Sequence, residues 1–368
     1  MRLVFVLEYY YPNIGGVETL FKSLIESLAK EGHQITIITS QVHANSPLKE
    51  KQGNIQISRI PFNNRYLFTF LGFFYILPYI KDSQLIHTTS YNAAIPAFFA
   101  AKLFRKKVII TFHEVWADLW YRLPFMGKLS KTVHYLFEQF LLKLPFSHFI
   151  GVSESTSKSL IQSGIESSKV STIYNGINYD DFQTNALPKK AKNGKYTYTY
   201  FGRMGISKGL DLLMEAIPLI RQKYPDSQFQ LIIPKVPVDF LNKISGFIEK
   251  NQLENYVILK HQLSFETLKK NIIASDCVVI PSYSEGFCFA AVETIALGTP
   301  LISSNQTALK EVVSGQFIKM DNFSKEALVE ALDKAQKGKW TKSPIKYFKL
   351  SDTIAQYKKL YREILEKT

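Results

Sequence analysis

Residues 197–214 read TYTYFGRMGISKGLDLLM, and this stretch predicts the fold of the chain. Thr197–Phe201 is rich in aromatic and β-branched residues, which is typical of a buried strand. A loop that contains glycines follows at once, and a helix is predicted from Gly209. A buried strand that leads through a glycine loop into a helix is the opening unit of a parallel α/β sheet.

The same alternation of strands and helices runs through the whole chain, in two halves. In the first half, strands are predicted at Leu3–Leu7, Gln34–Ser40, Ile55–Ile60, Leu85–Thr88, Val108–Phe112, His148–Val152 and Val170–Ile173. In the second half, they are predicted at Thr197–Phe201, Phe229–Ile233, Val257–Lys260, Cys277–Ile280 and Leu301–Ser303. Apolar strands separated by helices indicate a parallel sheet covered on both faces. The sequence therefore predicts an α/β protein with two Rossmann-like, parallel-sheet domains that face each other across a cleft.

A change in amino-acid composition marks the boundary between the two halves of the chain. Residues 186–195 are polar, basic and punctuated by proline and glycine, which is typical of a linker. We expect an N-terminal domain at residues 1–180 and a C-terminal domain at residues 181–350. The final helix, within residues 351–368, is expected to pack back on the N-terminal domain. Functional residues are sought in the loops after the strands, because ligands of such sheets bind at the carboxyl ends.

The composition excludes several classes of protein. Hydrophobic residues make up 46% and charged residues 21% of the 368 residues, so the chain is neither disordered nor fibrous. The net charge of +14 favours a phosphate-bearing or membrane-surface partner. No basic tail or aromatic–arginine motif stands out, so no nucleic acid partner is expected. The two cysteines, Cys277 and Cys288, lie in apolar surroundings and predict a reduced, cytoplasmic protein.

The longest uncharged run, Tyr66–Ile80, lies between Arg65 and Lys81. It is too short to span a bilayer, which takes about 20 residues. Two interpretations are open. The run is either a buried helix or an apolar surface that rests on an anionic membrane, at its cytoplasmic face. The N-terminus, where Glu8 ends a short apolar run, is not typical of a signal peptide.

Two loops in the first half are candidate functional sites. Gly15 and Gly16 open the first helix and would let backbone N–H groups approach an oxygen-rich ligand; an ordinary turn is the alternative. His113 follows a strand, where its ring could donate to a sugar hydroxyl or to developing negative charge; a structural histidine is the alternative. Neither the dinucleotide fingerprint nor the P-loop sequence is present, which disfavours a nicotinamide dehydrogenase and a P-loop kinase.

Two loops in the second half carry a stronger pattern. Arg203 and Lys208 lie across a glycine loop that opens a helix, and fixed positive charge there suits a diphosphate leaving group. Glu285 lies at the start of a later helix and Glu293 lies within it. Their carboxylates can accept hydrogen bonds from sugar hydroxyls and from a ribose diol, respectively. Backbone N–H groups around Phe287 can bind phosphate.

In their order and spacing these stretches resemble the retaining GT-B glycosyltransferases of family four, which carry a Glu-x7-Glu signature. The matching stretches are Gly15–Glu18, His113–Glu114, Gly151–Ser153, Asn175–Asn178, Phe201–Gly209, Glu285–Glu293 and Ala296–Pro300. The resemblance implies the GT-B fold and a UDP- or GDP-linked sugar donor that is bound mainly by the second domain. It also implies a glycan or lipid-linked acceptor on the first domain, retention at the anomeric carbon, no cofactor and no metal ion.

Carried over residue by residue, the resemblance implies the following roles. Arg203 and Lys208 would hold the diphosphate, Glu293 the ribose and Glu285 the transferred sugar, which His113 would contact near the reacting carbon. The catalytic candidates are thus His113, Arg203, Lys208 and Glu285. The donor-binding candidates are Gly15, Gly16, Arg203, Lys208, Glu285, Gly286, Phe287, Cys288 and Glu293.

The sequence also departs from the family pattern. Glu114 stands where an aspartate is common, Cys288 where a glycine is common, and Asn305–Ala308 where an aspartate and a glycine pair are usual. These differences leave the nucleotide base and the sugar open. Two other functions remain alternatives: an enzyme of the same architecture with other chemistry, such as a nucleotide-sugar epimerase or a sugar phosphorylase, and an inactive sugar-nucleotide binder.

Overall fold

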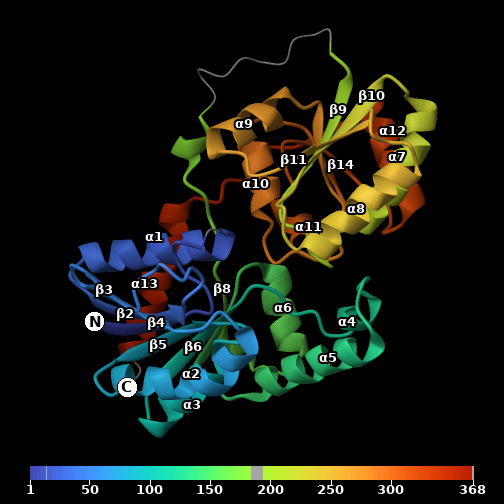
Figure 1. Ribbon diagram of the computed structural model, residues 1–368. Helices are drawn as coiled ribbons and strands as arrows, with labels where there is room; N and C mark the ends of the chain where they lie inside the picture. Colours follow the sequence, from blue (N-terminus) through green and yellow to red (C-terminus); the bar gives the residue numbers. More distant parts are fainter. Residues whose placement is uncertain (14, 184–193, 367–368) are drawn as a thin grey trace. The chain divides into compact units, whose positions relative to one another are not determined.

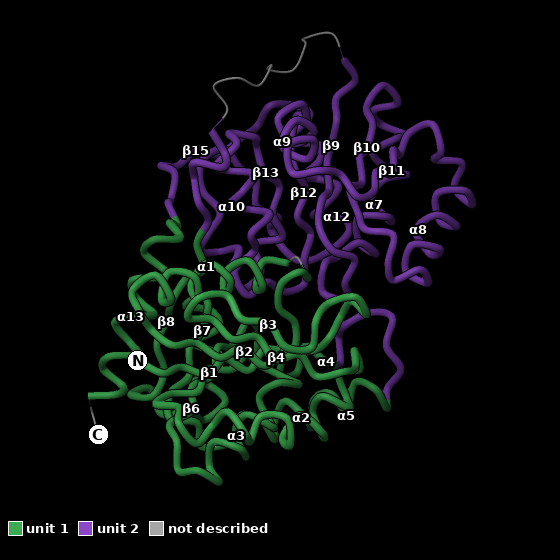
Figure 2. The backbone as a smooth tube through the Cα atoms, turned by 60° about the vertical axis from the view of Figure 1, so that its left-hand side comes forward, with its two compact units in different colours: residues 1–120, 129–176, 348–368 green, residues 121–128, 177–347 purple. Residues whose placement is uncertain are grey.

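The computed structural model describes residues 1–13, 15–183 and 194–366 (Figure 1). The chain divides into two compact units (Figure 2). Unit 1 consists of Met1–Trp120, Leu129–Gly176 and Phe348–Thr368, and unit 2 consists of Tyr121–Lys128 and Ile177–Tyr347. The linker predicted at residues 186–195 lies almost wholly outside the described residues.

The division differs from the predicted domains, which were residues 1–180 with 351–368, and residues 181–350. The largest difference is a short excursion, Tyr121–Lys128, that groups with unit 2. Its Phe125 ring meets the ring of Phe240 edge to face at 5.0 Å, and the ammonium group of Lys243 lies 5.0 Å from the Phe125 ring centre. A segment that sequence order assigns to the first domain thus packs on a helix of the second.

Unit 1 contains an eight-stranded sheet in the order β3-β4-β2-β1-β5-β6-β7-β8. Its strands are β1 (Arg2–Val6), β2 (Gln34–Ser40), β3 (Lys49–Gln52), β4 (Ile55–Ile60), β5 (Leu85–Thr89), β6 (Lys107–Phe112), β7 (His148–Gly151) and β8 (Val170–Thr172). Side chains alternate along β1, so that Leu3 and Phe5 enter one core cluster while Val4 and Val6 enter another. Both faces of the sheet are therefore buried.

Helices cover the two faces of this sheet (Figure 1). One face carries α1 (Gly16–Lys30) and α13 (Leu350–Glu366); the other carries α2 (Arg65–Ile80), α3 (Ala94–Leu103), α5 (Lys128–Lys143) and α6 (Glu154–Gln162). Two short helices complete the region, α4 (Leu119–Arg122) and η1 (Ser167–Lys169). The C-terminal helix α13 is tied to the sheet through His87, whose ring nitrogens lie 2.6 Å from the Tyr361 hydroxyl and 2.8 Å from the Thr111 hydroxyl.

Unit 2 contains a seven-stranded sheet in the order β11-β10-β9-β12-β13-β14-β15. Its strands are β9 (Tyr196–Phe201), β10 (Ser227–Ile232), β11 (Val257–Lys260), β12 (Cys277–Ile280), β13 (Leu301–Ser303), β14 (Gln316–Lys319) and β15 (Thr341–Lys342). Its helices are η2 (Tyr179–Phe182), α7 (Leu210–Lys223), α8 (Val238–Lys250), α9 (Phe265–Ala274), α10 (Phe289–Ala296), α11 (Leu309–Val312) and α12 (Lys325–Gln336).

Serine side chains cap three of the helices in the two units. The side-chain oxygen of each serine accepts a hydrogen bond from the backbone N–H of the residue three positions later: Ser153 for α6, Ser264 for α9 and Ser324 for α12.

In both sheets, the order in which strands are added reverses beside the first strand. In unit 1 the chain builds outward from β1 through β2 and then returns to place β5 on the other side of β1. In unit 2 it builds outward from β9 through β10 and returns to place β12 beside β9. In open α/β sheets, ligands bind outside the carboxyl ends of the strands at such a switch point.

The predicted fold class is confirmed, since each unit holds a parallel sheet covered by helices. The sheets are not parallel throughout, however, because β3 and β15 run antiparallel at their edges. The strand β3 was not predicted, because its residues Lys49–Gln52 are all charged or polar. A charged edge strand shows no apolar pattern, and its charges keep other strands from pairing with it.

Candidate active site

The switch point of unit 2 is formed by two loops in close contact. One loop, residues 202–209, follows β9, and the other, residues 281–288, follows β12. Gly209 has a φ of +67°, and a Cβ atom there would lie 1.9 Å from the carbonyl oxygen of Pro281. The backbone N–H of Tyr283 donates to the carbonyl of Ser207 at 2.8 Å. Glycine is therefore required at position 209 because the two loops touch backbone to backbone.

Two predicted site residues meet directly between these loops. The ammonium nitrogen of Lys208 lies 2.8 Å from Oε2 of Glu285, whose side chain is only 9% exposed. The Ser282 hydroxyl donates to Oε1 of Glu285 at 2.8 Å, so both carboxylate oxygens have a partner. The backbone of Glu285 is fixed as well, because its N–H donates to the Thr307 hydroxyl at 2.8 Å and its carbonyl accepts from that hydroxyl at 2.9 Å. The structure thus brings Lys208 and Glu285 together and holds the carboxylate rigidly.

Arg203 lies on the first of these loops. Its carbonyl oxygen accepts a hydrogen bond from the buried Tyr200 hydroxyl at 3.1 Å, which fixes the loop backbone. Its side chain is exposed. An exposed guanidinium group at the carboxyl end of β9 adds a second positive charge to the edge that already carries Lys208.

The helix α10 begins shortly after Glu285. Gly286, Phe287 and Cys288 are buried, and Cys288 precedes the first helical residue with a φ of +74°. Burial raises the pKa of the Cys288 thiol well above its usual range, so the group is a neutral thiol. The Cys288 side chain makes no capping hydrogen bond to the helix. Glycine is common at this position in the family pattern, and the left-handed backbone gives the physical reason.

Glu293 lies one turn into α10 and is half-buried. Burial raises the pKa of its carboxyl group to about 7. The group therefore titrates near neutral pH. A carboxyl group with a raised pKa, in the helix that follows an ion pair, is typical of a functional site.

The candidates of unit 1 lie at the carboxyl edge of its own sheet. Gly15 and Gly16 stand where α1 begins, as predicted, and the Gly15 carbonyl accepts from the N–H of Thr19 at 2.9 Å. Ile14 lies outside the described residues. The Asn13 side chain donates to Oε1 of Glu18 at 2.9 Å and so links the loop to the first turn of the helix.

His113 follows β6 and is half-buried. The loop behind it is held by Glu138 of α5, which is fully buried. The Glu138 carboxylate accepts the backbone N–H of Trp116 at 2.9 Å and that of Ala117 at 2.7 Å, and also the Tyr91 hydroxyl at 2.9 Å. Sequence reasoning missed Glu138. The available signal was a single acidic residue among apolar neighbours, in the stretch between the strands predicted at Val108–Phe112 and His148–Val152.

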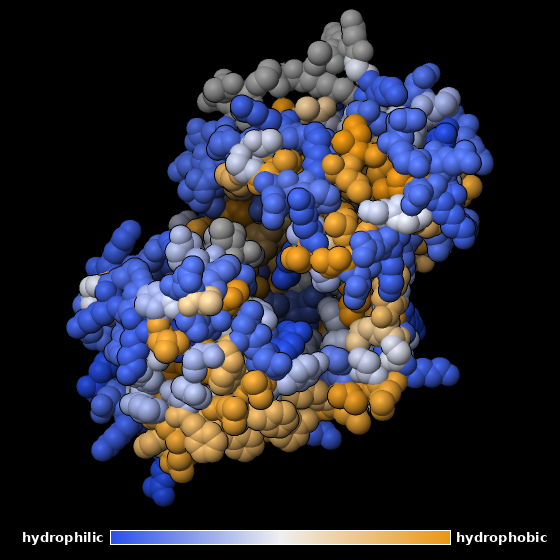
Figure 3. Space-filling view, viewed as in Figure 1, coloured by the Kyte–Doolittle hydropathy of each residue, from blue (hydrophilic) through white to orange (hydrophobic). Residues whose placement is uncertain are grey.

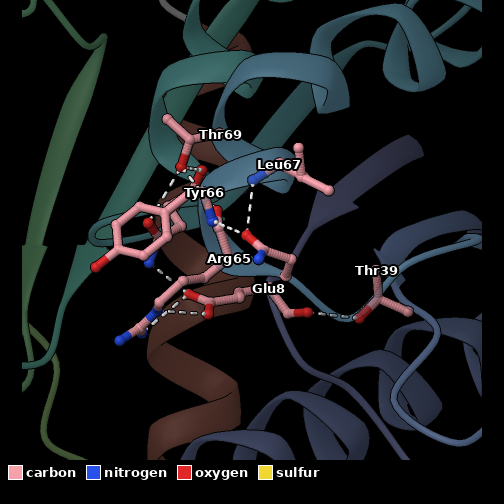
Figure 4. A network of polar contacts seen from close by, with 8 residues as sticks. Glu8, Thr39, Arg65, Tyr66, Leu67 and Thr69 are labelled. Atoms are coloured by element: carbon pink, nitrogen blue, oxygen red, sulfur yellow. Dashed lines mark hydrogen bonds and ion pairs between the residues drawn. The ribbon is translucent and has the colours of Figure 1, made fainter.

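A second network at this edge surrounds Glu8, just after β1 (Figure 4). The Glu8 carboxylate pairs with Arg65 at 3.2 Å and accepts from the Asn92 side chain at 2.9 Å. The Thr69 hydroxyl donates to the Asn92 side-chain oxygen at 3.1 Å, and the Thr39 hydroxyl donates to the Glu8 carbonyl at 3.3 Å. The loops after β1 and β5, and the end of β2, are thus connected to the start of α2. Sequence reasoning missed this network too, because its members lie far apart in the chain.

In the described part of the chain, no three His, Cys, Asp or Glu side chains are grouped so that they could hold a metal ion. In unit 1, Gly15, Gly16 and His113 lie on the loops after β1 and β6. In unit 2, the loops after β9 and β12 carry Arg203, Lys208, Glu285, Gly286, Phe287 and Cys288, and Glu293 lies in the helix α10 that follows.

Both halves of the chain match known families. Residues 14–181 match Glycosyltransferase Family 4, and residues 182–355 match Glycosyl transferases group 1. The chain belongs to the family-4 glycosyltransferases of the GT-B fold. A human phosphatidylinositol N-acetylglucosaminyltransferase subunit is 25% identical over 344 residues, which cover 91% of this chain and 68% of the relative.

Solved structures show the same fold. Sucrose-phosphate synthase from Thermosynechococcus elongatus aligns with a TM-score of 0.78 at 18% identity, covering 100% of this chain and 99% of that one. HepE from Anabaena, solved with UDP-glucose, aligns with a TM-score of 0.73 at 15% identity, covering 99% of this chain and 100% of that one. At these identities the likeness concerns the fold alone.

Proposed function

We propose that this glycosyltransferase moves a sugar from a UDP- or GDP-linked donor to a hydroxyl group of a glycan or lipid-linked acceptor, with retention at the anomeric carbon. The products would serve the synthesis of a polysaccharide or glycoconjugate. Two similar proteins support this proposal: HepE was solved with UDP-glucose, and the human relative is named for N-acetylglucosaminyl transfer to phosphatidylinositol.

The contact between Lys208 and Glu285 carries the proposal. A sugar nucleotide needs a cation for its diphosphate and a fixed acceptor group for its sugar hydroxyls, side by side. The Lys208 ammonium and the Glu285 carboxylate lie 2.8 Å apart at the switch point, where ligands of such sheets bind. The Ser282 hydroxyl uses one lone pair of Glu285 Oε1, so the other remains available to accept from a sugar hydroxyl.

The proposed reaction breaks the bond between the anomeric carbon and the diphosphate oxygen, and that oxygen takes up the bonding electrons. Arg203 and Lys208 stabilise the negative charge that develops there, together with the first N–H groups of α10. The acceptor hydroxyl forms the new bond from the face that the diphosphate leaves, and its proton passes to the departing diphosphate. His113 would contact the sugar near the reacting carbon.

A screen of UDP- and GDP-sugars by mass spectrometry tests the donor class. Hydrolysis or transfer of one donor is expected, with loss in Lys208→Ala and no effect of a metal chelator. An interconverted sugar nucleotide would instead indicate an epimerase, phosphorolysis would indicate a sugar phosphorylase, and binding without turnover an inactive binder. Proton NMR of the product tests stereochemistry, because a β-linked product from an α-linked donor would contradict retention.

A further inference from the structure

The helix α2 is apolar on both sides, but only one side is buried. Phe68, Gly72, Ile76 and Ile80 face the core. The opposite stripe is exposed to solvent and comprises Tyr66, Leu67, Phe70, Leu71, Phe74 and Tyr75, with Phe70 at 75% and Phe74 at 65% exposure. The interpretation of Tyr66–Ile80 as a buried helix therefore holds for one side of the helix only. A stripe of this kind is costly to leave in water and indicates a surface that binds something.

Two further helices on the same side of unit 1 extend this stripe. On α5, the exposed apolar residues are Leu129, Val133, Leu136 and Phe140, which recur every three to four residues and so form one stripe. On α3, Phe99 and Leu103 are exposed. Figure 3 shows apolar side chains gathered over α2, α3 and α5. We call these twelve residues the apolar face.

The charges around the apolar face are mostly positive. The three helices contain a single carboxylate, Glu138, which is fully buried. Basic residues lie in or directly beside the helices: Arg65, Lys81, Lys102, Arg105, Lys106, Lys128, Lys131 and Lys143. Arg65 is paired with Glu8, and the acidic Asp82 follows Lys81. The other six residues, Lys102, Arg105, Lys106, Lys128, Lys131 and Lys143, are called the basic rim of the apolar face.

We propose that the apolar face docks on the surface of an anionic phospholipid membrane, with the aromatic residues of α2 in the headgroup boundary and the basic rim on lipid phosphates. Aromatic side chains with basic neighbours suit an interface of this kind. No helix in the described residues is long and apolar enough to cross a bilayer. A second copy of the chain fits less well, because a symmetric contact would bring two basic rims together.

This proposal goes beyond the proposed function and does not depend on it, since binding to vesicles requires no transfer reaction. Flotation with vesicles tests it directly. The intact protein is expected to float with vesicles of phosphatidylcholine and phosphatidylglycerol at low salt, to float far less with phosphatidylcholine alone, and to be released by high salt.

Charged substitutions at exposed positions keep the test independent of folding. The double variant Phe70→Glu and Phe74→Glu should bind vesicles at least tenfold more weakly, with an unchanged melting temperature. Ile161→Glu, at an exposed position on α6 of the same unit, is the matched control and should bind normally. Lys102→Ala and Lys143→Ala should each weaken binding about fivefold.

Three results would overturn the proposal: no flotation at low salt, equal flotation with neutral vesicles, or full binding by the double variant. A fourth is a dimer in size-exclusion chromatography that the double variant converts to a monomer without any vesicle binding. That result would make the apolar face a contact between copies of the chain.

Discussion

The two units have the same strand arrangement around their first strand, yet different side chains stand on the loops at their switch points. In unit 2, the loops after β9 and β12 carry Arg203 and Lys208 and meet backbone to backbone at Gly209. In unit 1, the loops after β1 and β6 carry Glu8 and His113, and hydrogen-bonded carboxylates hold these loops in place. The shared topology fixes where a ligand can bind. Under the proposed function, the side chains at each edge would decide which ligand binds: Arg203 and Lys208 in unit 2 would bind the diphosphate, and the acceptor hydroxyl would bind at the edge of unit 1.

The glycine loops of the two units should respond very differently to alanine. Gly209→Ala places a Cβ atom 1.9 Å from the Pro281 carbonyl oxygen at a φ of +67°, and both loops must move. We expect unit 2 to lose more than about 3 kcal/mol of unfolding free energy, measured by urea denaturation. In unit 1, the nearest atoms to a Cβ atom on Gly15 would be those of the Glu18 carboxylate, which stands at the end of a side chain and can turn away. Gly15→Ala should therefore cost less than about 1.5 kcal/mol. Equal losses would contradict the contrast.

Removal of the cation at the switch point of unit 2 should abolish most of the transfer activity. Lys208→Ala is expected to lower turnover of the sugar nucleotide about 100- to 1,000-fold, because the charge that develops on the diphosphate loses a fixed partner. Calorimetry with UDP and GDP should show weaker binding by about 1.5–3 kcal/mol. Lys270→Ala, on the exposed side of α9, is the matched control and should behave as the unaltered protein. Unchanged nucleotide affinity in Lys208→Ala would remove the residue from the site.

The two units should also differ in the sign of their pH dependence. In unit 1, burial lowers the pKa of His87 from 6.5 to about 3. As the pH falls below 6.5, His87 becomes protonated in the unfolded chain but stays neutral in the folded chain. The stability due to neutral His87 is therefore fully present above pH 6.5 and falls as the pH drops towards 3. The slope is about 1.4 kcal/mol per pH unit.

In unit 2, burial raises the pKa of Glu293 from 4.5 to about 7. Its contribution is present below pH 4.5 and falls as the pH rises to 7.

Urea denaturation at pH 5 and pH 7 measures both effects. His87→Asn should remove the loss of stability that unit 1 suffers between pH 7 and pH 5. Glu293→Gln should remove the opposite trend in unit 2. If neither substitution changes the difference between the two pH values, the burial of these groups does not control their titration.

The loop behind His113 should depend on one carboxylate of unit 1. Glu138→Gln replaces an oxygen that accepts a backbone N–H by an amide group that donates, so one of the N–H groups of Trp116 and Ala117 loses its acceptor. We expect a loss of about 1–3 kcal/mol and faster hydrogen exchange at these two amides. Glu154→Gln, at an exposed position on α6, is the control and should leave both quantities unchanged. Slow exchange in Glu138→Gln would show that the loop is held by other contacts.

The sequence was sufficient for most of the parallel strands and for the loops that carry the candidate residues, although the parallel strand β14 at Gln316–Lys319 was not predicted. The strands Ile55–Ile60 and Cys277–Ile280 were predicted with their observed bounds, because alternating apolar residues in the first and continuous apolar residues in the second are both typical of strands. It was insufficient where partners are distant in the chain. Glu8 and Asn92, or Glu138 and Trp116, meet only after the sheet has formed. The exposed half of α2 was ambiguous for a different reason. Its apolar composition is the same on the core side and on the solvent side, so periodicity could not separate them.

The smallest expected effect concerns the two cysteines, which sit in contrasting backbones of unit 2. Cys288 has a φ of +74° before α10, whereas Cys277 begins the buried strand β12. A Cβ atom in the left-handed region costs about 1–2 kcal/mol, and only glycine avoids this. Cys288→Gly should therefore be more stable than Cys288→Ala by about 1 kcal/mol, since both lose the thiol but only alanine keeps the strain. At position 277 the reverse is expected: Cys277→Ala should be more stable than Cys277→Gly by about 0.5–1 kcal/mol, because glycine in an extended strand loses more entropy on folding. Thermal unfolding of the four variants measures both differences, and the same order at the two positions would show that the backbone at Cys288 is not strained.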